Sequence, residues 1–434
     1  MGSVTPPAAG TGPVDPSSPI LPEPAPLPVP AGETAVHAVN PFKVDRRLKR
    51  NVEFWIRIYS QYDTKEGVIH DAKYIDKIYE IVHFEENMSR RRQVHLVREA
   101  KRKWKEVLLS VNRKQKDPSR MNEDELRVFN MFSDVNESDK FAGAASRKRV
   151  RFQLGQKDRF KEGLYLSGLY LPYMEEVFRR EGLPVELTRL PFVESSFNIN
   201  ARSKVGASGV WQFMRSTGRF FLRINDTIDE RNDPLRATEA AAKLLKANYE
   251  ALKSWPLAVT AYNHGRQGML RAVQRVGSDD LEDLVDEYRS RSFGFASSNF
   301  FTCLLAAIEV ERNSEKYFGK VERAQPLMYY EAQMPDAVAL KDLVRFMSLD
   351  LVQVKALNPG LSSNVWKGRR PVPAGYALRL PLDGNTGKES ATQVFLAGYS
   401  QIPQTFKVPQ SRNESRSQAS DRPARHRRRH RRTR

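Results

Sequence analysis

Hydrophobic positions repeat at helical spacing through most of the chain. Between residues 41 and 160 the pattern lies within strongly basic segments. Its members are Val97, Ala100, Trp104, Val107, Leu108 and Val111, and earlier Tyr74, Ile75, Ile78, Tyr79 and Val82. An apolar residue every three or four positions is typical of an amphipathic helix. We therefore expect residues 41–160 to form a helical accessory region, with most of its Lys and Arg side chains on solvated faces.

Residues 161–318 also favour helices, with one Gly-rich interruption from Asn198 to Gly209. Asp233 followed by Pro234 predicts a helix start, because Asp caps the first turn and Pro suits the first helical position. Small apolar residues follow at Ala237, Ala240, Ala241, Leu244 and Leu245. A further helix is expected through Trp255–Ala261, with Gly265 placed to end it. The fold class should therefore be mainly α.

The two ends of the chain and the segment 327–382 differ from this helical middle. Residues 1–40 are dominated by Pro, Ala, Gly and Val, which predicts a disordered linker. In 327–382 the strand-like YYEAQ and YALRLPL flank two short helical patterns, which predicts a small β-α-α-β module. Residues 385–434 turn polar and then Arg/His-rich, so we expect a disordered basic tail.

Composition narrows the classes of partner. The 434 residues carry a formal charge of +19, which points to an anionic partner such as nucleic acid, an acidic membrane surface or the bacterial envelope. Cys303 is the sole cysteine, which excludes an internal disulfide and a cysteine-based metal site, and we expect a small buried thiol. No apolar run approaches the roughly 18 residues of a membrane span. The start MGSVTPPAAG lacks the pattern of a signal peptide, so for an exported protein either the signal was removed or the start was assigned downstream.

Glu194 is the candidate for acid/base chemistry. Leu187, Leu190 and Glu194 are spaced to share one face of a helix. A carboxyl on an apolar stripe should be partly desolvated, which raises its pKa toward that of a general acid. Taken alone, such a residue is more often a structural carboxyl with its hydrogen bonds satisfied.

The neighbouring residues strengthen the catalytic hypothesis. Gly206, Ala207, Ser208 and Gly209 keep the backbone slim, as a bound sugar chain would require. Hydrogen-bonding groups come from Ser203, Gln212 and Asn263, and flat apolar rings from Phe197, Trp211, Phe213 and Tyr262. The alternative for each ring is core packing.

The segment ESSFNINARSKVGASGVWQFM resembles the signature of the lysozyme-like lytic transglycosylases, and within them the D-type membrane-bound murein enzymes. DERNDP, an Ala-rich helix and AYNHG then follow in that family's order. The resemblance covers about residues 180–315. It implies an all-helical lysozyme-like domain that cleaves the β-1,4 bond between N-acetylmuramic acid and N-acetylglucosamine.

The resemblance also implies roles for single residues. Glu194 matches the one catalytic acid/base, and no second carboxylate accompanies it in the motif. The matching substrate-binding positions are Ser195, Ser203, Gln212, Met214, Tyr262 and Asn263. Structural roles fall to Asp229, Arg231 and Asp233. The sugar's own 6-hydroxyl would close a 1,6-anhydro ring, so no metal or cofactor is implied.

Two positions depart from the family pattern. AYNHG places His264 where the family has Ala, and a neutral surface histidine is the favoured interpretation over a catalytic one. In the family's Glu-Thr-x-x-Tyr, this chain has Ala296 for Glu and Phe300 for Tyr. A supporting carboxylate and a hydroxyl are therefore missing from these positions.

The segment 327–382, with ALNPGL and AGYALRLP, resembles a degenerate LysM module, which implies glycan binding; a structural appendage is the alternative. The expected partner is the peptidoglycan glycan strand in the periplasm or envelope, with anionic envelope polymers as partners of the basic tail. A hydrolytic muramidase and a non-catalytic peptidoglycan-binding protein remain open alternatives. Nucleic-acid binding ranks last, because the core shows no such motif.

Overall fold

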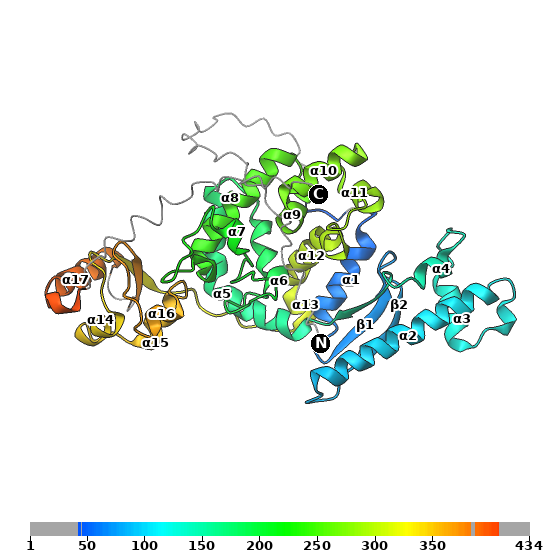
Figure 1. Cartoon of the computed structure of the whole chain (residues 1–434), viewed down its shortest axis with the longest axis horizontal. Helices are drawn as coiled ribbons and strands as arrows, with labels where there is room; N and C mark the ends of the chain where they lie inside the picture. The colour runs from blue at the N-terminus through cyan, green and yellow to red at the C-terminus, as the bar shows by residue number, and fades with distance from the viewer. Residues whose placement is uncertain (1–41, 45, 383–386, 408–434) are drawn as a thin grey trace, which may run out of the picture. The chain divides into compact units, whose positions relative to one another are not determined.

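The computed structural model describes residues 42–44, 46–382 and 387–407, and it divides into two compact units (Figure 1). The first unit runs to Ile224 and resumes over Glu230–Leu327. The second unit combines Asn225–Asp229 with the chain from Met328 onward. The expected linker at 1–40 and the end of the expected tail, from 408, lie outside the described residues.

The first unit is mainly helical, as expected, and it contains the segments 41–160 and 161–318 apart from Asn225–Asp229. Its earlier elements are α1 (Lys49–Ser60), β1 (Glu66–Asp71), β2 (Ile78–His83), α2 (Arg90–Lys114), η1 (Pro118–Arg120), α3 (Glu123–Met131), α4 (Lys140–Ala144) and β3 (Val150–Leu154). Its later elements are α5 (Lys157–Arg180), η2 (Val185–Arg189), α6 (Leu190–Glu194), α7 (Arg215–Gly218), η3 (Glu230–Asn232), α8 (Pro234–Leu252), α9 (Trp255–His264), α10 (Arg266–Val276), α11 (Leu281–Glu287), α12 (Phe295–Arg312) and α13 (Ser314–Phe318).

The expectation that residues 41–160 are helical throughout is wrong. Three strands form an antiparallel sheet in the order β2-β1-β3, and α2 packs on one face of it through Trp104, Leu108 and Val111. The apolar spacing at 74–82 fits a helix, but the β-branched Ile78 and the residues after it pair with β1 instead. The Lys- and Arg-rich helix expected around Trp104 is confirmed as α2.

α1 joins this sheet to the rest of the first unit. On one side the Phe54 ring lies 4.7 Å from the ring of His70 in β1. On the other side the Trp55 indole nitrogen donates a hydrogen bond of 3.3 Å to Asn299 in α12. α12 is buried nearly all round and also packs against α6 and α9, so it is the central helix of the unit.

The predicted helix boundaries around the Gly-rich segment are confirmed. Asp233 caps α8, and its side chain accepts hydrogen bonds from the backbone of Leu235 and Arg236. α9 ends at Gly265, where the sequence placed its end. The small residues of α8 face the core and let this helix pack against α5 and α9.

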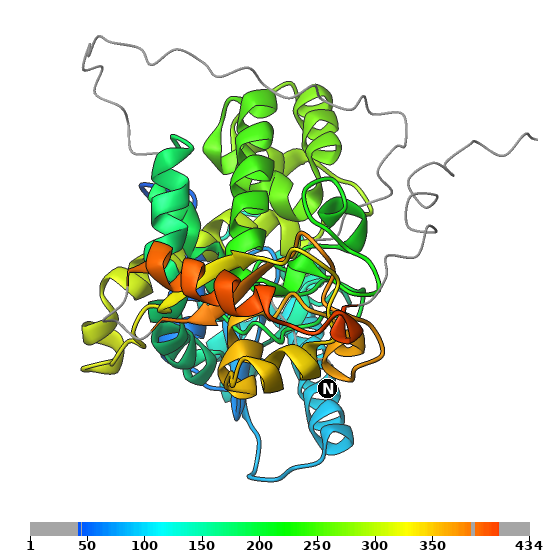
Figure 2. The same cartoon turned by 90° about the vertical axis from the view of Figure 1, so that its left-hand side faces the viewer.

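In the second unit, residues 327–382 have the expected β-α-α-β order with one short helix, α16 (Ser363–Trp366), added before the last strand, and α17 (Lys388–Ser400) and η4 (Gln404–Phe406) follow. The other elements of this unit are β4 (Tyr329–Gln333), α14 (Leu340–Phe346), α15 (Leu351–Leu357) and β5 (Ala377–Pro381). β4 and β5 pair antiparallel, and α17 packs against β4 (Figure 2). Disorder from residue 385 is therefore wrong for 388–400, because Phe395 and Tyr399 are buried in this unit's core.

The segment Asn225–Asp229 is a part of the second unit that the sequence did not predict. Ile228 is 2% exposed within its hydrophobic core and forms a β-bridge with Leu361. The Asp229 backbone N–H donates 2.8 Å to the Gly360 carbonyl. This unit is thus built from two stretches of chain that lie about a hundred residues apart in sequence.

Gly209 tests how tightly the Gly-rich segment is packed. Its φ is +79°, and a Cβ there would lie 1.8 Å from the Arg231 carbonyl oxygen. We expect Gly209→Ala to lower the free energy of unfolding by about 3 kcal/mol or more, because it adds a backbone clash to the strain of a positive φ. Chemical denaturation of the full chain measures the change.

The matched control is Gly277→Ala. Gly277 has a similar φ of +78° at the end of α10, but no atom lies within 4 Å of the added methyl group. It should cost only about 1–2 kcal/mol, from the backbone conformation alone. Equal costs at both positions would contradict the close packing described for Gly209.

Candidate active site

Glu194 is the last residue of α6, and its carboxyl is buried. Leu187 and Leu190 are also buried, although a 3₁₀ turn (η2) precedes α6 in place of one continuous helix. Glu194 is 1% exposed, and neither carboxyl oxygen has a hydrogen-bond partner among the described residues. Burial raises the pKa of Glu194 well above its ordinary value of 4.5, which favours the protonated, proton-donating form.

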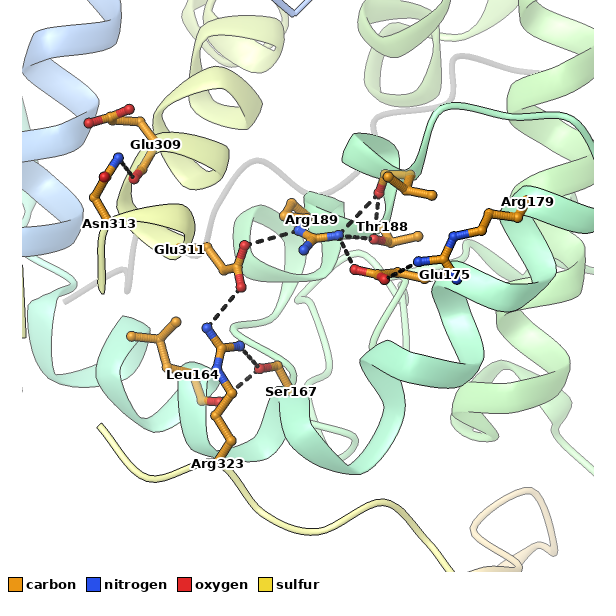
Figure 3. A network of polar contacts seen from close by, with 11 residues as sticks. Leu164, Ser167, Glu175, Arg179, Thr188, Arg189, Glu309, Glu311, Asn313 and Arg323 are labelled. Carbon is orange, nitrogen blue, oxygen red and sulfur yellow. Dashed lines mark hydrogen bonds and ion pairs between the residues drawn. The ribbon is translucent and has the colours of Figure 1, made fainter. Parts of the chain in front are cut away.

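A polar network holds the segment that leads into α6 (Figure 3). Arg189 donates from Nε to Glu311 of α12 at 3.1 Å and from Nη1 to Glu175 of α5 at 2.6 Å. Glu311 also accepts from Arg323 at 2.8 Å, and Arg323 donates to the Ser167 hydroxyl at 3.0 Å. The helix carrying Glu194 is therefore tied at its start to α5 and α12.

The chain turns sharply immediately after Glu194. Ser196 and Phe197 have φ values of +50° and +58°, in the left-handed region that non-glycine residues rarely adopt. Each such residue costs roughly 1–2 kcal/mol, and strain of this kind clusters at functional sites. Phe197 is fully buried, and its packing against Phe192 holds the turn in place.

Several of the expected substrate-binding side chains brace the Gly-rich segment. The Ser195 hydroxyl donates to the Val210 carbonyl at 2.9 Å, and the Gln212 amide donates to the Gly209 carbonyl at 2.7 Å. The Ser203 hydroxyl accepts from the Ala207 backbone N–H at 2.8 Å. Met214 is partly exposed just before α7. Substrate contact by these residues stays a prediction.

Arg231 holds the same segment from the other side. Its side chain is 5% exposed and donates from Nη1 to the Gly206 carbonyl at 2.9 Å and to the Phe213 carbonyl at 3.3 Å. The structural roles expected for Arg231 and for Asp233 agree with these contacts.

Tyr262 is the predicted site residue that the structure brings to Glu194. Its hydroxyl donates to the Trp211 carbonyl at 2.8 Å, and its ring stacks on Phe300 at an angle of 7°. Burial raises the pKa of Tyr262, and the nearby Glu194 raises it further. The adjacent Asn263 accepts a hydrogen bond of 2.8 Å from the Ser297 hydroxyl of α12.

The aromatic residues considered for sugar stacking belong to the core. Phe197 and Trp211 are fully buried, and Phe213 is 2% exposed. The Trp211 ring stacks on Phe178 at 5.8 Å, and its indole nitrogen donates to Thr238. The alternative of core packing therefore holds for these three rings.

His264 is neutral as expected, but it does not lie on the surface. It is 5% exposed and packs edge-on against Phe293 at 5.1 Å. Burial lowers the pKa of His264, and the neighbouring Arg271 lowers it further. A buried ring with a lowered pKa stays uncharged at neutral pH.

The sequence did not indicate that Tyr59 and Cys303 lie near Glu194. Tyr59 of α1 is 1% exposed, and among the described residues its hydroxyl interacts only with the weakly accepting sulfur of Cys303. Burial raises the pKa of Tyr59, with further contributions from the Cys303 thiol and from Glu194. Cys303 is buried in α12, as expected, and also experiences the charge of Glu194.

Tyr59 places a hydroxyl near Glu194. Phe300, at the position where the family has Tyr, has no hydroxyl. The apolar stripe Val52, Trp55, Ile58, Tyr59 and Tyr62 predicts a buried helix face. That stripe could not indicate which residues the face covers, because α1 meets α12 across more than two hundred residues of chain.

Within the described ranges, no group of three or more His, Cys, Asp or Glu side chains lies close enough to hold a metal ion. The same ranges contain no helix long and apolar enough to cross a membrane.

The segment that contains Glu194 and Tyr262 matches a known protein family. Residues 175–285 match the family model of the transglycosylase SLT domain. This part of the chain, which carries Glu194, Gln212 and Tyr262, is therefore a transglycosylase SLT domain.

Individual relatives are more distant. The chain is 25% identical over 266 residues to membrane-bound lytic murein transglycosylase D of Escherichia coli K12, across 58% of this chain and 57% of the relative. It is 32% identical over 109 residues to a putative tributyltin chloride resistance protein of an Alteromonas strain, across 25% of this chain and 53% of that protein. The chain thus spans a little over half the length of these relatives.

Among solved structures, an inactive mutant of the lytic transglycosylase Slt from Pseudomonas aeruginosa matches at 15% identity with a TM-score of 0.28. The match covers 51% of this chain and 33% of that one.

The raised pKa of Glu194 predicts a pH-dependent effect of Glu194→Gln on stability. A raised folded-state pKa means that the stability contributed by the protonated carboxyl is fully present below the unfolded pKa. It is then lost, by up to about 1.4 kcal/mol per pH unit, as pH rises toward the folded value. Gln does not titrate, so the mutant should gain stability relative to wild type from about pH 4.5 upward. Urea unfolding at pH 4, 6 and 8 measures this difference, and a difference that is constant with pH would contradict the buried carboxyl.

Proposed function

We propose that this protein is a peptidoglycan lytic transglycosylase that uses Glu194 as its single acid/base. The observation that carries the proposal is a buried carboxyl without a hydrogen-bond partner inside an SLT domain. The bond cleaved is the β-1,4 link between N-acetylmuramic acid and N-acetylglucosamine. The activity of membrane-bound lytic murein transglycosylase D, as its name gives it, supports this assignment.

The chemistry needs one carboxyl used twice. Glu194 donates its proton to the leaving glycosidic oxygen while the 2-acetamido group of the sugar stabilises the positive charge at the anomeric carbon. The carboxylate then takes the proton of the sugar's 6-hydroxyl, whose oxygen bonds to that carbon and closes the 1,6-anhydro ring. Burial alone accounts for the raised pKa of Glu194, with no charged group of the described residues contributing. This supports a one-carboxylate mechanism over the usual pair.

The substrate needs a path to this carboxyl. Both oxygens of Glu194 are covered, so the glycosidic oxygen reaches them only when a covering side chain rotates. The exclusion of water that results favours the sugar hydroxyl over water as the nucleophile. A hydrolytic muramidase of the same fold is the alternative, and it would give reducing ends in place of anhydro ends. A non-catalytic peptidoglycan-binding protein would release neither product.

Tyr59 is proposed as a positioning residue for Glu194. Of the hydroxyl and thiol neighbours of Glu194, the Tyr262 hydroxyl already donates to Trp211, and a thiol is a weak donor. The Tyr59 hydroxyl is engaged only by the weakly accepting Cys303 sulfur, so it can turn to donate to the Glu194 carboxylate in the interval between the two proton transfers.

The second unit and the tail extend the proposal to the cell envelope. The β-α-α-β order with paired β4 and β5 supports a LysM-like module, and a second glycan site would raise the local substrate concentration. The Arg/His-rich tail would add non-specific attraction to anionic envelope polymers. The protein would then act in the periplasm or at the envelope.

Glu194→Gln should abolish lytic activity while the chain still folds and binds glycan. Gln keeps the shape of Glu but cannot donate the proton, and one positioned acid/base is worth about 10²–10⁴ in rate. The loss should reach the upper end of that range because both steps use the same group. The measurement is the release of anhydro-muropeptides from purified sacculi. The control is Glu186→Gln, a partly exposed carboxyl in the turn before α6. A mutant that keeps more than about a tenth of the wild-type rate would exclude Glu194 as the acid/base.

Tyr59→Phe should lower kcat by about 10- to 100-fold, the value of one hydrogen bond to a charged group, with little change in KM. Losing the donor destabilises the carboxylate, so the alkaline limb of the pH–rate profile should move to higher pH. The control is Tyr62→Phe, because Tyr62 is equally buried but its hydroxyl accepts from Arg57. If both variants keep the wild-type pH profile, Tyr59 has only a packing role.

A further inference from the structure

Positive charge gathers at β3, the edge strand of the N-terminal sheet, beside the start of α12. His70 in β1 and Arg151 in β3 are direct cross-strand partners, so their side chains share a face. Phe295, the first residue of α12, lies against both, 4.2 Å from the Arg151 guanidinium and 5.6 Å from the His70 ring. Lys101, from α2 on the other face of the sheet, and Arg147 lie near enough to Arg151 to interact with each other's charges. We name these four residues the Arg151 cluster (His70, Lys101, Arg147 and Arg151).

The positive charges of the cluster interact electrostatically, which lowers the pKa values of Lys101 and His70. Burial lowers the pKa of Lys101, and Arg151 and Arg147 lower it further. Burial also lowers the pKa of His70 to about 3, with smaller contributions from Arg151 and Lys101. Arg151 is itself largely buried, and burial lowers its pKa. The cluster thus concentrates like charges in a partly dehydrated place.

No carboxylate among the described residues pairs with Lys101, Arg147 or Arg151. The Arg151 Nε has no hydrogen-bond partner there, and neither has Nε2 of the fully buried His70, whose Nδ1 contacts the Asp71 carbonyl at 2.9 Å. Arg149, only two residues away in sequence, behaves differently, because its guanidinium binds the Asp71 carboxylate at 2.9–3.1 Å.

An unpaired, partly buried guanidinium is costly, because its lost hydration is not replaced. An anion with two oxygens would replace it, since the planar guanidinium matches carboxylate and phosphate groups. Arg151 and Lys101 remain partly exposed and Arg147 is exposed, so a ligand can enter from solvent. His70 is neutral and would add a donor only after protonation.

We propose that the Arg151 cluster is an anion-binding site and, resting on the proposed function, that it takes a carboxylate of the peptide carried by the glycan strand. α12 connects the cluster to Glu194. Phe295 lies on Arg151, and two residues later Ser297 donates to Asn263, next to Tyr262. N-acetylmuramic acid bears its peptide on the sugar at the cleaved bond, so one ligand can reach both places.

The test is binding to the full chain carrying Glu194→Gln, which removes turnover. The probes are an N-acetylmuramyl peptide with free carboxylates, the same compound with its carboxylates amidated, and inorganic phosphate, each measured by calorimetry. Adding Arg151→Gln should weaken binding of the free-carboxylate probe at least tenfold and leave the amidated probe unchanged. Arg98→Gln is the matched control, an exposed arginine of α2 with the same loss of charge and no role in the cluster.

A second readout separates a ligand site from a structural group. Without anion, Arg151→Gln should leave the melting temperature unchanged or raise it, because it removes an uncompensated charge. It should abolish the rise in melting temperature that the free-carboxylate probe produces in the parent. If Arg151→Gln does not fold, the variant Lys101→Gln replaces it in the same binding and melting measurements, because Lys101 is the half-buried cation of the cluster.

The outcomes are distinct. Tenfold weakening confined to the free-carboxylate probe supports the proposal. Tight binding of phosphate, with equal binding of both peptide probes, would retain an anion site and overturn the peptide assignment. If adding Arg151→Gln leaves the binding of every probe unchanged, the Arg151 cluster is not an anion-binding site. Because cleavage is not measured, a protein that fails to release anhydro products can still pass this test, and an active enzyme can fail it.

Discussion

The burial of the Glu194 carboxyl is the constraint on which the rest of the first unit depends. A carboxyl hidden from water without a hydrogen bond is unfavourable when it ionises, so the surrounding structure must hold it there. The Arg189 network fixes the segment before it to α5 and α12, and the left-handed turn at Ser196 and Phe197 carries the chain away after it. Tyr59 of α1, Tyr262 of α9 and Cys303 of α12 are all buried and lie near enough to Glu194 for its charge to raise their pKa values.

This constraint explains why the SLT match alone does not account for the site. Residues 175–285 provide Glu194 and Tyr262. Cys303 of α12 and Tyr59 of α1 lie outside that range, yet both experience the charge of Glu194. α1 in turn rests on the sheet through Phe54 and His70. The N-terminal region thus contributes a buried side chain, Tyr59, to the surroundings of Glu194.

The polar side chains of the Gly-rich segment form hydrogen bonds mainly with the backbone of the segment itself. Ser195, Ser203 and Gln212 direct their polar groups to backbone carbonyl and amide groups of the segment, and Arg231 secures it from η3. Gly209 can be no larger, because the Arg231 carbonyl lies where its Cβ would stand. The polar side chains that the motif offers as sugar-binding groups therefore stabilise the backbone of the Gly-rich segment next to Glu194.

The sequence by itself determined those features that depend on residues close together in the chain. The start of α8 was predictable because Asp233 caps amides two and three residues away, and the β-α-α-β order because each element has its own apolar period. The burial of Glu194 was predictable because this residue follows an apolar stripe inside a specific motif. Only the tertiary structure decided whether 78–82 would be strand or helix, since that depends on pairing with β1. It also decided that His264 and Trp211 are buried, that Ile228 joins the second unit, and that Tyr59 lies within range of the charge of Glu194. These outcomes arise from contacts between segments far apart in the chain, and no local pattern of residues records which distant surface will cover a given face.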